Sequence, residues 1–374
     1  MKSLYITFIP LIDGDGITKK VKAQHQAFIK YGLDMELSYM DIANGIKTYV
    51  IANERYPLGN KVVAKLKHNA VYSVVYNYLV DYVRVNSIRF VYIRYRLGAS
   101  NSYINFLCKL KAIGVKVFIE IPTYPYDGEV NPNNLYLLYK ISVEKHYRKQ
   151  LSRVVDRIVT FSSDKLIFNT SCINISNAID FDTIPLRADC PQHDYIKFSA
   201  VASINFWHGY DRMIRAIAEY NNKSSNKKEA YLDIVGKGRA LKDLQLLVEE
   251  LSVEKYVKFC GRKEGDALTK IFEDTDVCVG SLGRHRSGIY EMRALKNVEY
   301  AARGIAFIYS ENNLDFDNQP YVYKVSSDER PIDIDDVLKE LDKNNYSPMD
   351  IRNSVSHLSW EAQIKIILDQ ISQK

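Results

Sequence analysis

The residue types best suited to chemistry gather in and after one glycine-bearing loop, residues 280–288. Its ionisable side chains and those that follow are Arg284, His285, Arg286, Glu291, Lys296 and Glu299. Guanidinium forks match phosphate oxygens, and carboxylates accept hydrogen bonds from ribose hydroxyls in nucleotide sites. The pattern therefore predicts a diphosphate held by Arg284, Arg286 and Lys296, and a ribose held by Glu299.

Glu299 also has a structural interpretation. On a single helix Glu291 and Glu299 would lie about 80° apart, so we expect Glu291 in the loop and Glu299 at the start of the next helix. An acid in the first helical turn interacts favourably with the helix dipole. Both interpretations of Glu299 stay open at this point.

Three other loops lie between a predicted strand and a predicted helix, where backbone N–H groups can bind phosphate or sugar hydroxyls. Their candidates are Gly16, His208 and the pair Gly236 and Gly238. The ordinary alternatives are a tight turn, a capping or surface histidine, and a helix-entry turn. Arg262, at the end of a further strand, offers a plane for a nucleobase to rest on.

The segment 120–129 combines prolines, tyrosines and acids after an apolar strand. Such a stiff, ring-lined surface suits the binding of sugars. Glu120, at the strand end, is a candidate base that orients an acceptor hydroxyl. The alternative is a buried, hydrogen-bonded structural glutamate.

Two series of strand–helix units must position these loops, because short β-branched runs alternate with amphipathic stretches twice along the chain. In the first half we predict strands at Ser3–Ile9, Asp34–Tyr39, Phe90–Arg94, Lys116–Ile121 and Arg157–Phe161, and helices at Ile17–Lys30 and Ser102–Ile113. In the second half we predict strands at Lys197–Val201, Tyr231–Val235, Val257–Cys260, Thr275–Val279 and Ile305–Tyr309, and helices at Tyr210–Tyr220, Ala240–Leu251, Asp266–Phe272, Leu295–Ala302 and Ser359–Ile371.

The expected fold class is α/β, with two Rossmann-like doubly wound domains that face a central cleft. We place them at residues 1–185 and 190–350, followed by a helical segment, 351–374, that packs back toward the first domain. Pro185 and Pro191 interrupt the pattern near the join. Ligands bind beyond the carboxyl ends of the strands in such sheets.

The composition is that of a globular protein, with 374 residues of which 47% are hydrophobic, so collagen-like and disordered classes are excluded. We find no apolar run long enough for a spanning helix and no signal-peptide cleavage site, and we expect a cytoplasmic protein. Five cysteines without a C-x-x-C pair indicate reduced core residues, and no metal site is predicted.

Positive charge is concentrated in the first half. Residues 1–185 hold 24 Lys and Arg against 15 Asp and Glu, and the rest of the chain is slightly acidic. Peripheral docking on an anionic membrane, at the inner face of the plasma membrane, would use Arg84, Arg89, Arg94, Arg96, Lys145, Arg148, Lys149, Arg153 and Arg157. Solvated helix faces are the alternative, and no nucleic-acid-binding motif is present.

Several short motifs together resemble the retaining glycosyltransferases of family 4, which have the two-Rossmann architecture called GT-B. They are the acid–seven–acid spacing from Glu291 to Glu299 that runs into Gly304, the turn at Gly236, the strand end at Phe259–Gly261, and the linker Asn177–Asp180. The resemblance spans nearly the whole chain and is densest at 196–310. It implies transfer of a sugar from a nucleotide diphosphate donor to a saccharide or lipid-linked saccharide, as in assembly of a surface polysaccharide such as a capsule.

The resemblance also implies roles for individual residues. Glu299 would hold the ribose, Glu291 the donor sugar, and Gly16 would approach the transferred sugar or the diphosphate. Glu120 stands roughly where many members carry a histidine. Members also clamp the diphosphate with an Arg and a Lys, whereas Ser203 and His208 stand at those places here.

The clamp must then come from elsewhere, and Arg284, Arg286 and Lys296 are the candidates. In the implied mechanism, these cations stabilise the leaving diphosphate without a metal or other cofactor. The acceptor attacks from the same face, and the departing phosphate helps to remove its proton.

Two other functions remain open. A metal-dependent transferase would use an Asp-x-Asp motif, and matches to this short pattern include those that begin at Asp13, Asp180, Asp315 and Asp333. A non-catalytic nucleotide-sugar or saccharide-binding protein would explain the absent Arg and Lys.

Overall fold

The computed structural model describes the chain except for residues 13–14, 44, 61–67, 97, 130–133, 190–191, 224–227, 344–345 and 373–374. The chain divides into two compact units. Unit 1 comprises Met1–Ile175 and Trp360–Lys374, and unit 2 comprises Ser176–Ser359. The first boundary therefore precedes the expected join at 185–190, and the segment expected at 351–374 is shared between the units.

Unit 1 is built on one nine-stranded sheet with the order β4-β3-β2-β1-β5-β6-β7-β9-β8. The strands are β1 (Lys2–Pro10), β2 (Asp34–Ala43), β3 (Ile46–Ile51), β4 (Glu54–Asn60), β5 (Phe90–Arg94), β6 (Lys116–Ile121), β7 (Arg157–Thr160), β8 (Leu166–Ile167) and β9 (Thr170–Asn174). Neighbouring strands from β2 to β9 are parallel, and β3, β4 and β8 add antiparallel edges.

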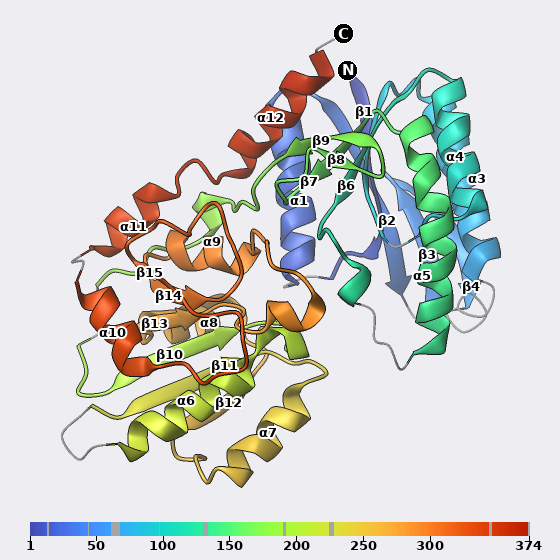
Figure 1. The fold of residues 1–374 in the computed structure, drawn as a ribbon. Helices are drawn as coiled ribbons and strands as arrows, with labels where there is room; N and C mark the ends of the chain where they lie inside the picture. Colours follow the sequence, from blue (N-terminus) through green and yellow to red (C-terminus); the bar gives the residue numbers. More distant parts are fainter. Residues whose placement is uncertain are drawn as a thin grey trace. The chain divides into compact units, whose positions relative to one another are not determined.

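Helices cover both faces of this sheet: α1 (Gly16–Lys30), α3 (His68–Val85), α4 (Asn101–Ala112), α5 (Leu135–Tyr147) and α12 (Trp360–Ser372). In Figure 1, α1 and α12 lie on one face, and α3 and α4 lie together on the other. Trp360, 2% exposed, anchors α12, and Lys30 pairs with Glu361 across the two helices. The expected return of the last helix to the first domain is confirmed.

Unit 2 has a parallel sheet with the order β12-β11-β10-β13-β14-β15. Its strands are β10 (Ile196–Val201), β11 (Ala230–Val235), β12 (Val257–Gly261), β13 (Val277–Val279), β14 (Ala306–Tyr309) and β15 (Val322–Lys324). Its helices are α6 (Tyr210–Asn222), α7 (Leu241–Glu250), α8 (Gly265–Glu273), α9 (Leu295–Ala302), α10 (Ile334–Asp342) and α11 (Pro348–Ser354). One buried cluster packs α6, α7 and α10 on one face, and another packs α9 and α11 on the other.

Short 3-10 helices complete the loops: η1 (Asp127–Glu129), η2 (Arg148–Arg153), η3 (Phe181–Thr183), η4 (Phe206–His208) and η5 (Arg284–Ser287). The strand order of unit 2 is the one typical of dinucleotide-binding folds. The chain first adds strands on one side of β10 and then, from β13 on, adds them on the other side, so the switch point lies between β10 and β13. In unit 1 the switch point lies between β1 and β5. These two switch points are where an open α/β sheet binds ligands.

Two sequence expectations concern the chain as a whole. The four described cysteines, Cys108, Cys172, Cys260 and Cys278, are free thiols, and Cys190 lies outside the described residues. Within the described ranges, no helix combines the length and the apolar character needed to cross a bilayer.

Candidate functional site

Two loops meet at the switch point of unit 2 through a close backbone contact. Gly209 has a φ of +62°, and a Cβ there would lie 2.7 Å from the nitrogen of Gly283. The N–H of Leu282 donates to the carbonyl of His208 at 2.8 Å. Only glycine satisfies both the left-handed backbone and the close approach. The contact holds η4, which follows β10, against the start of the loop that follows β13.

The predicted Gly236 and Gly238 fasten a third loop to the same place. A Cβ on Gly236 would lie 1.9 Å from the carbonyl oxygen of Ala202, and one on Gly238 would lie 1.9 Å from that of Ile204. Packing between loops therefore accounts for both glycines. Their contact with a donor stays a prediction.

Five side chains come together where these loops meet, and we call them the switch-point cluster: His208, Tyr210, Arg284, Lys296 and Glu311. The Nζ of Lys296 donates to the hydroxyl of Tyr210 at 3.2 Å. The rings of His208 and Tyr210 stack with their centroids 5.3 Å apart. The cluster joins η4, α6, η5, α9 and the segment after β14.

The cluster contains two coupled, oppositely charged groups. Burial lowers the pKa of Lys296 to about 7, with a further lowering by Arg284 and an opposing effect of Glu311. Burial also raises the pKa of Glu311, which Arg284 and Lys296 oppose. Lys296 therefore changes its charge near neutral pH, so a bound anion would hold it protonated.

His208 is a buried capping residue. Its Nδ1 accepts a hydrogen bond from the backbone N–H of Asn205 at 3.0 Å and completes a capping box. Burial, with Lys296 and Arg284, holds its pKa well below the ordinary value, so the ring is neutral at pH 7. The capping alternative fits this geometry and the surface alternative does not. A neutral ring cannot supply the positive charge of the lysine that the resemblance expects.

Among the described residues, buried polar atoms without a hydrogen-bond partner occur within the cluster, at Glu311, and on the segments that carry it, at Asn297 and Ser281. Both oxygens of Glu311, both amide atoms of Asn297 and the hydroxyl of Ser281 have no hydrogen bond within the described part of the chain. All three residues are at most 1% exposed. Buried polar groups are almost always satisfied, so these atoms point to an unfilled need for water or a ligand.

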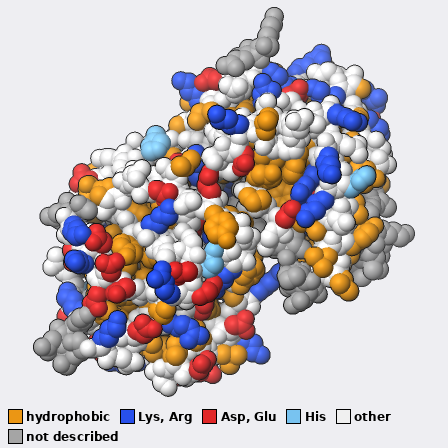
Figure 2. Space-filling model, viewed as in Figure 1, with side chains coloured by type: hydrophobic (Ala, Val, Ile, Leu, Met, Phe, Trp, Pro, Cys, Tyr) orange, Lys and Arg blue, Asp and Glu red, His pale blue; other side chains and the backbone are white. Residues whose placement is uncertain are grey.

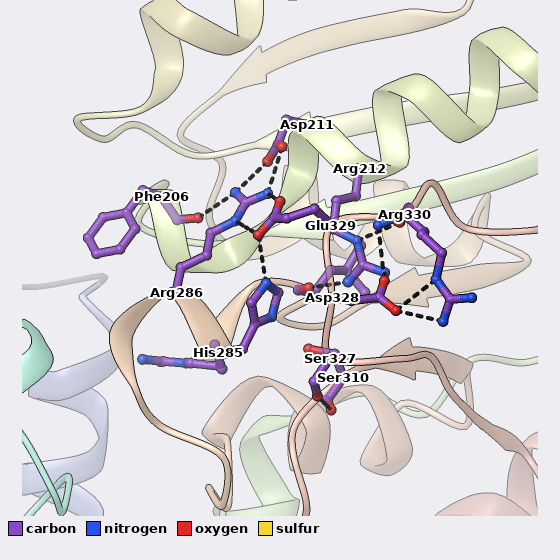
Figure 3. A network of polar contacts seen from close by, with 12 residues as sticks. Phe206, Asp211, Arg212, His285, Arg286, Ser310, Ser327, Asp328, Glu329 and Arg330 are labelled. Carbon is purple, nitrogen blue, oxygen red and sulfur yellow. Dashed lines mark hydrogen bonds and ion pairs between the residues drawn. The ribbon is translucent and has the colours of Figure 1, made fainter.

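Arg286 does not belong to the switch-point cluster. It donates to Asp211 from Nη1 and Nη2 at 2.8 Å each, and to Glu329 from Nε at 2.9 Å. Figure 3 shows its guanidinium between the two carboxylates. These partners raise the pKa of Arg286, and Arg286 holds the pKa of Glu329 at about 2. The expected phosphate contact of Arg286 is therefore corrected: its charge is already compensated, and it ties η5 to α6.

Arg284 and Arg262 differ in their surroundings. Arg284 is 7% exposed, and its guanidinium lies 5.5 Å from the ring centroid of Trp207. Arg262 follows β12 and pairs with Glu264 at 2.6 Å, with about half of its side chain exposed. Contact of Arg262 with a nucleobase stays a prediction.

The two acids of the spacing motif occupy different elements. Glu299 is the fifth residue of α9 and accepts from Nε and Nη2 of Arg303 at 3.0 and 2.9 Å. It is therefore outside the first turn, and the interpretation through the helix dipole is wrong. Glu291 precedes the helix and forms an isolated β-bridge with Asn312, beside Glu311.

In unit 1, Glu120 is fully buried at the end of β6. It accepts hydrogen bonds from Gln24 at 2.7 Å and Tyr92 at 2.8 Å, and it pairs with Lys20 at 3.6 Å and with Arg94. Burial alone would raise the pKa of Glu120, but Lys20 and Arg94 bring it below the ordinary value. A fully engaged, ionised and inaccessible carboxylate fits the structural alternative, and we do not retain Glu120 as a base.

The remaining predicted residues of unit 1 are less constrained. Gly16 begins α1 and is exposed, and Asp15 caps the helix by accepting from the N–H groups of Ile17 and Thr18. Asp13 and Gly14 lie outside the described residues.

Sequence reasoning missed Glu311 and Tyr210. Glu311 follows the predicted strand Ile305–Tyr309 by two residues, so the rule that ligands bind beyond strand ends would have pointed to it. Tyr210 was not identified because it is the first residue of a predicted helix, where an aromatic residue is expected to pack in the core.

Known proteins resemble this chain in sequence over part of its length and in fold over nearly all of it. Residues 189–314 match the family described as glycosyl transferases group 1. No curated protein sequence matches the chain. Among solved structures, sucrose-phosphate synthase from Thermosynechococcus elongatus matches with a TM-score of 0.71 at 13% identity, over 99% of this chain and 98% of that one.

Two further structures match over the full chain. The E. coli trehalose-6-phosphate protein bound with UDP-2-fluoro glucose has a TM-score of 0.62 at 12% identity and covers 100% of this chain and 99% of its own. S. aureus TarM, as a mutant with fondaparinux, alpha-GlcNAc-glycerol and UDP, has a TM-score of 0.59 at 10% identity and full coverage of both chains. The expected GT-B fold, with two Rossmann-like domains, is confirmed.

Proposed function

We propose that this protein is a retaining glycosyltransferase that moves a sugar from a nucleotide diphosphate sugar to a saccharide or lipid-linked saccharide. The observation that carries the proposal is the switch-point cluster, which gathers Arg284 and Lys296 beside partnerless buried polar atoms. It lies within the segment that matches glycosyl transferases group 1. Two of the similar structures contain UDP or a UDP-sugar, which supports the choice of donor class.

Charge development explains what the cluster would do. As the bond between the sugar and the diphosphate breaks, negative charge grows on the leaving oxygens. Arg284 and protonated Lys296 would stabilise that charge from fixed positions, which costs no reorganisation during the reaction. Lys296 would replace the lysine that related enzymes carry near His208. Glu299 would hold the ribose and Glu291 the donor sugar, as the resemblance implies.

Retention of configuration would follow from attack on the same face of the sugar. The leaving phosphate would accept the proton of the acceptor hydroxyl, so no separate protein base is required. This suits a protein in which Glu120 is locked in a buried ion-pair network. A metal-independent reaction is part of the proposal, and it predicts full activity in EDTA.

The exposed aromatic and basic side chains of unit 1 support a lipid-linked acceptor and a site of action at a membrane surface. Leu135, Tyr136 and Tyr139 of α5 are 80%, 58% and 67% exposed. The same helix carries Lys140 and Lys145, whereas Arg94 and Arg148 of the predicted basic set are engaged with buried carboxylates. An exposed aromatic and basic helix suits a bilayer surface that carries a lipid-linked acceptor of a surface polysaccharide. Cosedimentation with anionic and neutral vesicles tests this part alone.

Thermal stabilisation by UDP, GDP, ADP and their sugars tests the donor assignment. A ligand that binds only the folded state raises the melting temperature. We expect one nucleotide series to stabilise the wild type and to have much less effect on a Lys296→Gln, Arg284→Gln double variant. Equal stabilisation of both proteins would contradict the assigned site.

A non-catalytic binding protein is the second candidate function. Its support is that Ser203 and the neutral His208 stand in place of the family's Arg and Lys. Release of UDP from the stabilising UDP-sugar, with and without an acceptor mixture, separates the two. Tight binding without any turnover, in EDTA or with added Mn²⁺, would favour the binding protein.

A further inference from the structure

A second pocket lies in unit 1, at the switch point of its own sheet. It opens beside the end of β1 at Phe8 and beside Tyr95, Arg96 and Gly98–Ser100 after β5, and α3, α4 and α5 close its sides. Aromatic rings make up much of the lining. We call it the tyrosine pocket and define it by Phe8, Tyr72, Tyr76, Tyr95, Tyr103 and Arg96.

The rings form a connected wall. Phe8 contacts Tyr72 and Tyr76 with centroids 5.8 and 5.7 Å apart, and Tyr76 contacts Tyr103 at 5.7 Å. These edge contacts fix the rings in place, so the wall is pre-formed. Small-molecule pockets typically combine such a wall with a few polar groups that fix the orientation of the ligand.

Two cations, Arg96 and Lys140, line the pocket, and a third, Lys47, lies beside one of its rings. Arg96 donates to the hydroxyl of Tyr72 at 3.2 Å and to the carbonyl of Phe8 at 3.3 Å. Lys140 of α5 lines the pocket, and the Nζ of Lys47 lies 5.3 Å from the ring centroid of Tyr72. Burial lowers the pKa of Lys47 and of Lys140, and the positive charge of Arg96 lowers both further.

Among the described residues, no carboxylate forms an ion pair with Arg96, Lys140 or Lys47. The buried acid of α5, Glu144, is occupied because Tyr95, Tyr126 and Arg148 all donate to it. Arg96 repels both lysines, and such like charges persist beside an open pocket most easily if an anion binds there. The hydroxyl of Tyr103, which lines the same pocket and is 3% exposed, has no hydrogen-bond partner within the described ranges.

We propose that the tyrosine pocket binds the acceptor through a sugar ring that carries an anionic group, a phosphate or a carboxylate. The rings hold the sugar, Tyr103 bonds one of its hydroxyls, and Arg96, Lys140 and Lys47 hold the anion. Only the identification of this sugar as the acceptor rests on the proposed function. Figure 2 shows hydrophobic side chains next to lysines and arginines over α5, at the edge of this region.

Binding to the full-length protein, followed by isothermal titration calorimetry, tests the proposal. The probes are glucose, glucose 6-phosphate, glucuronate and inorganic phosphate, each with saturating UDP to occupy unit 2. A charge-assisted contact is worth about tenfold in affinity, so one or both anionic sugars should bind about tenfold more tightly than glucose. Which of the two binds identifies phosphate or carboxylate as the group recognised.

Two variants locate the binding. Arg96→Gln with Lys140→Gln should remove the preference for the anionic sugar, whereas Arg84→Gln, on an exposed part of α3, should keep it. Tyr103→Phe should weaken the anionic sugar several-fold without loss of melting temperature, because the removed hydroxyl has no partner to lose.

Three results would overturn the inference: equal binding of glucose and both anionic sugars, a preference that survives Arg96→Gln with Lys140→Gln, or inorganic phosphate that binds as tightly as the anionic sugars. The outcome is separable from the donor assignment. Stabilisation by a nucleotide together with failure of all sugar probes would refute the tyrosine pocket and leave the proposed function standing.

Discussion

The guanidinium of Arg286 and the carboxylate of Asp211 form a bidentate pair, with both N···O distances 2.8 Å. Asp211 lies in the first turn of α6, and Arg286 lies in η5. The pair therefore fixes the loop that presents Arg284 to the switch-point cluster. Arg286, which the sequence suggests as a phosphate ligand, therefore has a structural role, because it connects η5 to α6.

Replacing Arg286 should lower the stability of the fold more than it lowers the affinity for a charged ligand. We expect Arg286→Gln to lower the free energy of unfolding by about 1–2 kcal/mol, because its hydrogen bonds to charged groups are lost in a partly exposed site. Urea melts measure this, and Asp211→Asn provides the matched variant for a double-mutant cycle. Additive effects of the two substitutions would contradict a direct pair.

Nucleotide affinity should depend on pH through Lys296. Its pKa is lowered to about 7, so the side chain is mostly protonated below pH 7 and mostly neutral above it. A diphosphate favours the protonated form, and the affinity for UDP should fall by about tenfold between pH 6.5 and 8.5. Calorimetry in buffers of different ionisation enthalpy should also detect proton uptake on binding.

Lys296→Gln is the control for this pH dependence. It cannot titrate, while the ligand and the rest of the site are unchanged. Its affinity should be low and nearly flat over the same range. A wild-type profile that runs parallel to that of the variant would assign the pH dependence to the ligand.

The close approach of Gly209 to Gly283 should be sensitive to one added methyl group. Gly209→Ala combines a strained backbone with a Cβ 2.7 Å from neighbouring backbone atoms. Gly261→Ala has a similar φ of +66° and open space around its Cβ, so it serves as the strain-only control. We expect Gly209→Ala to lose more stability than the control and to lose nucleotide stabilisation, as thermal melts would show.

Glu120 should prove to be a stability residue. Glu120→Gln leaves Lys20 and Arg94 buried without their carboxylate, which typically costs about 3–5 kcal/mol. Because the pKa of Glu120 is below its ordinary 4.5, its contribution is present above that pH and is lost as pH falls through the lowered value. Denaturant melts between pH 3 and pH 6 should show this acid loss in the wild type and not in the variant.

Transfer activity distinguishes the structural role of Glu120 from a catalytic one. Activity measured per folded molecule, at a temperature where Glu120→Gln is still folded, should stay within a fewfold of the wild type. A loss of several orders of magnitude in kcat with an unchanged melt would restore Glu120 as a base.

The sequence predicted the centre of each sheet well, because buried parallel strands are continuous apolar runs. β5 and β6 begin and end at the predicted residues, and α9 does also. The edges were missed. β3 and β4 form an antiparallel pair with mixed polarity, and neither these strands nor α3 are among the predicted elements.

The site was predictable in part for a physical reason. Spacing along the chain located the loop that carries Arg284 and the helix that carries Lys296, because both follow strand ends. It could not show which cations are already paired, since Asp211 and Glu329 approach Arg286 from distant segments. The partners of Glu120 likewise come from α1 and from the neighbouring strand β5.

Because α12 belongs to unit 1 but follows unit 2 in the sequence, unit 1 can finish folding only after unit 2 has been synthesised. Unit 1 needs residues 360–372 to cover α1, but the whole of unit 2 is translated before them. On the ribosome, the first unit to be synthesised is therefore the last to be finished. A nascent chain stalled just before Trp360 would hold a complete second unit while the apolar side of α1 stays uncovered and exposed to chaperones.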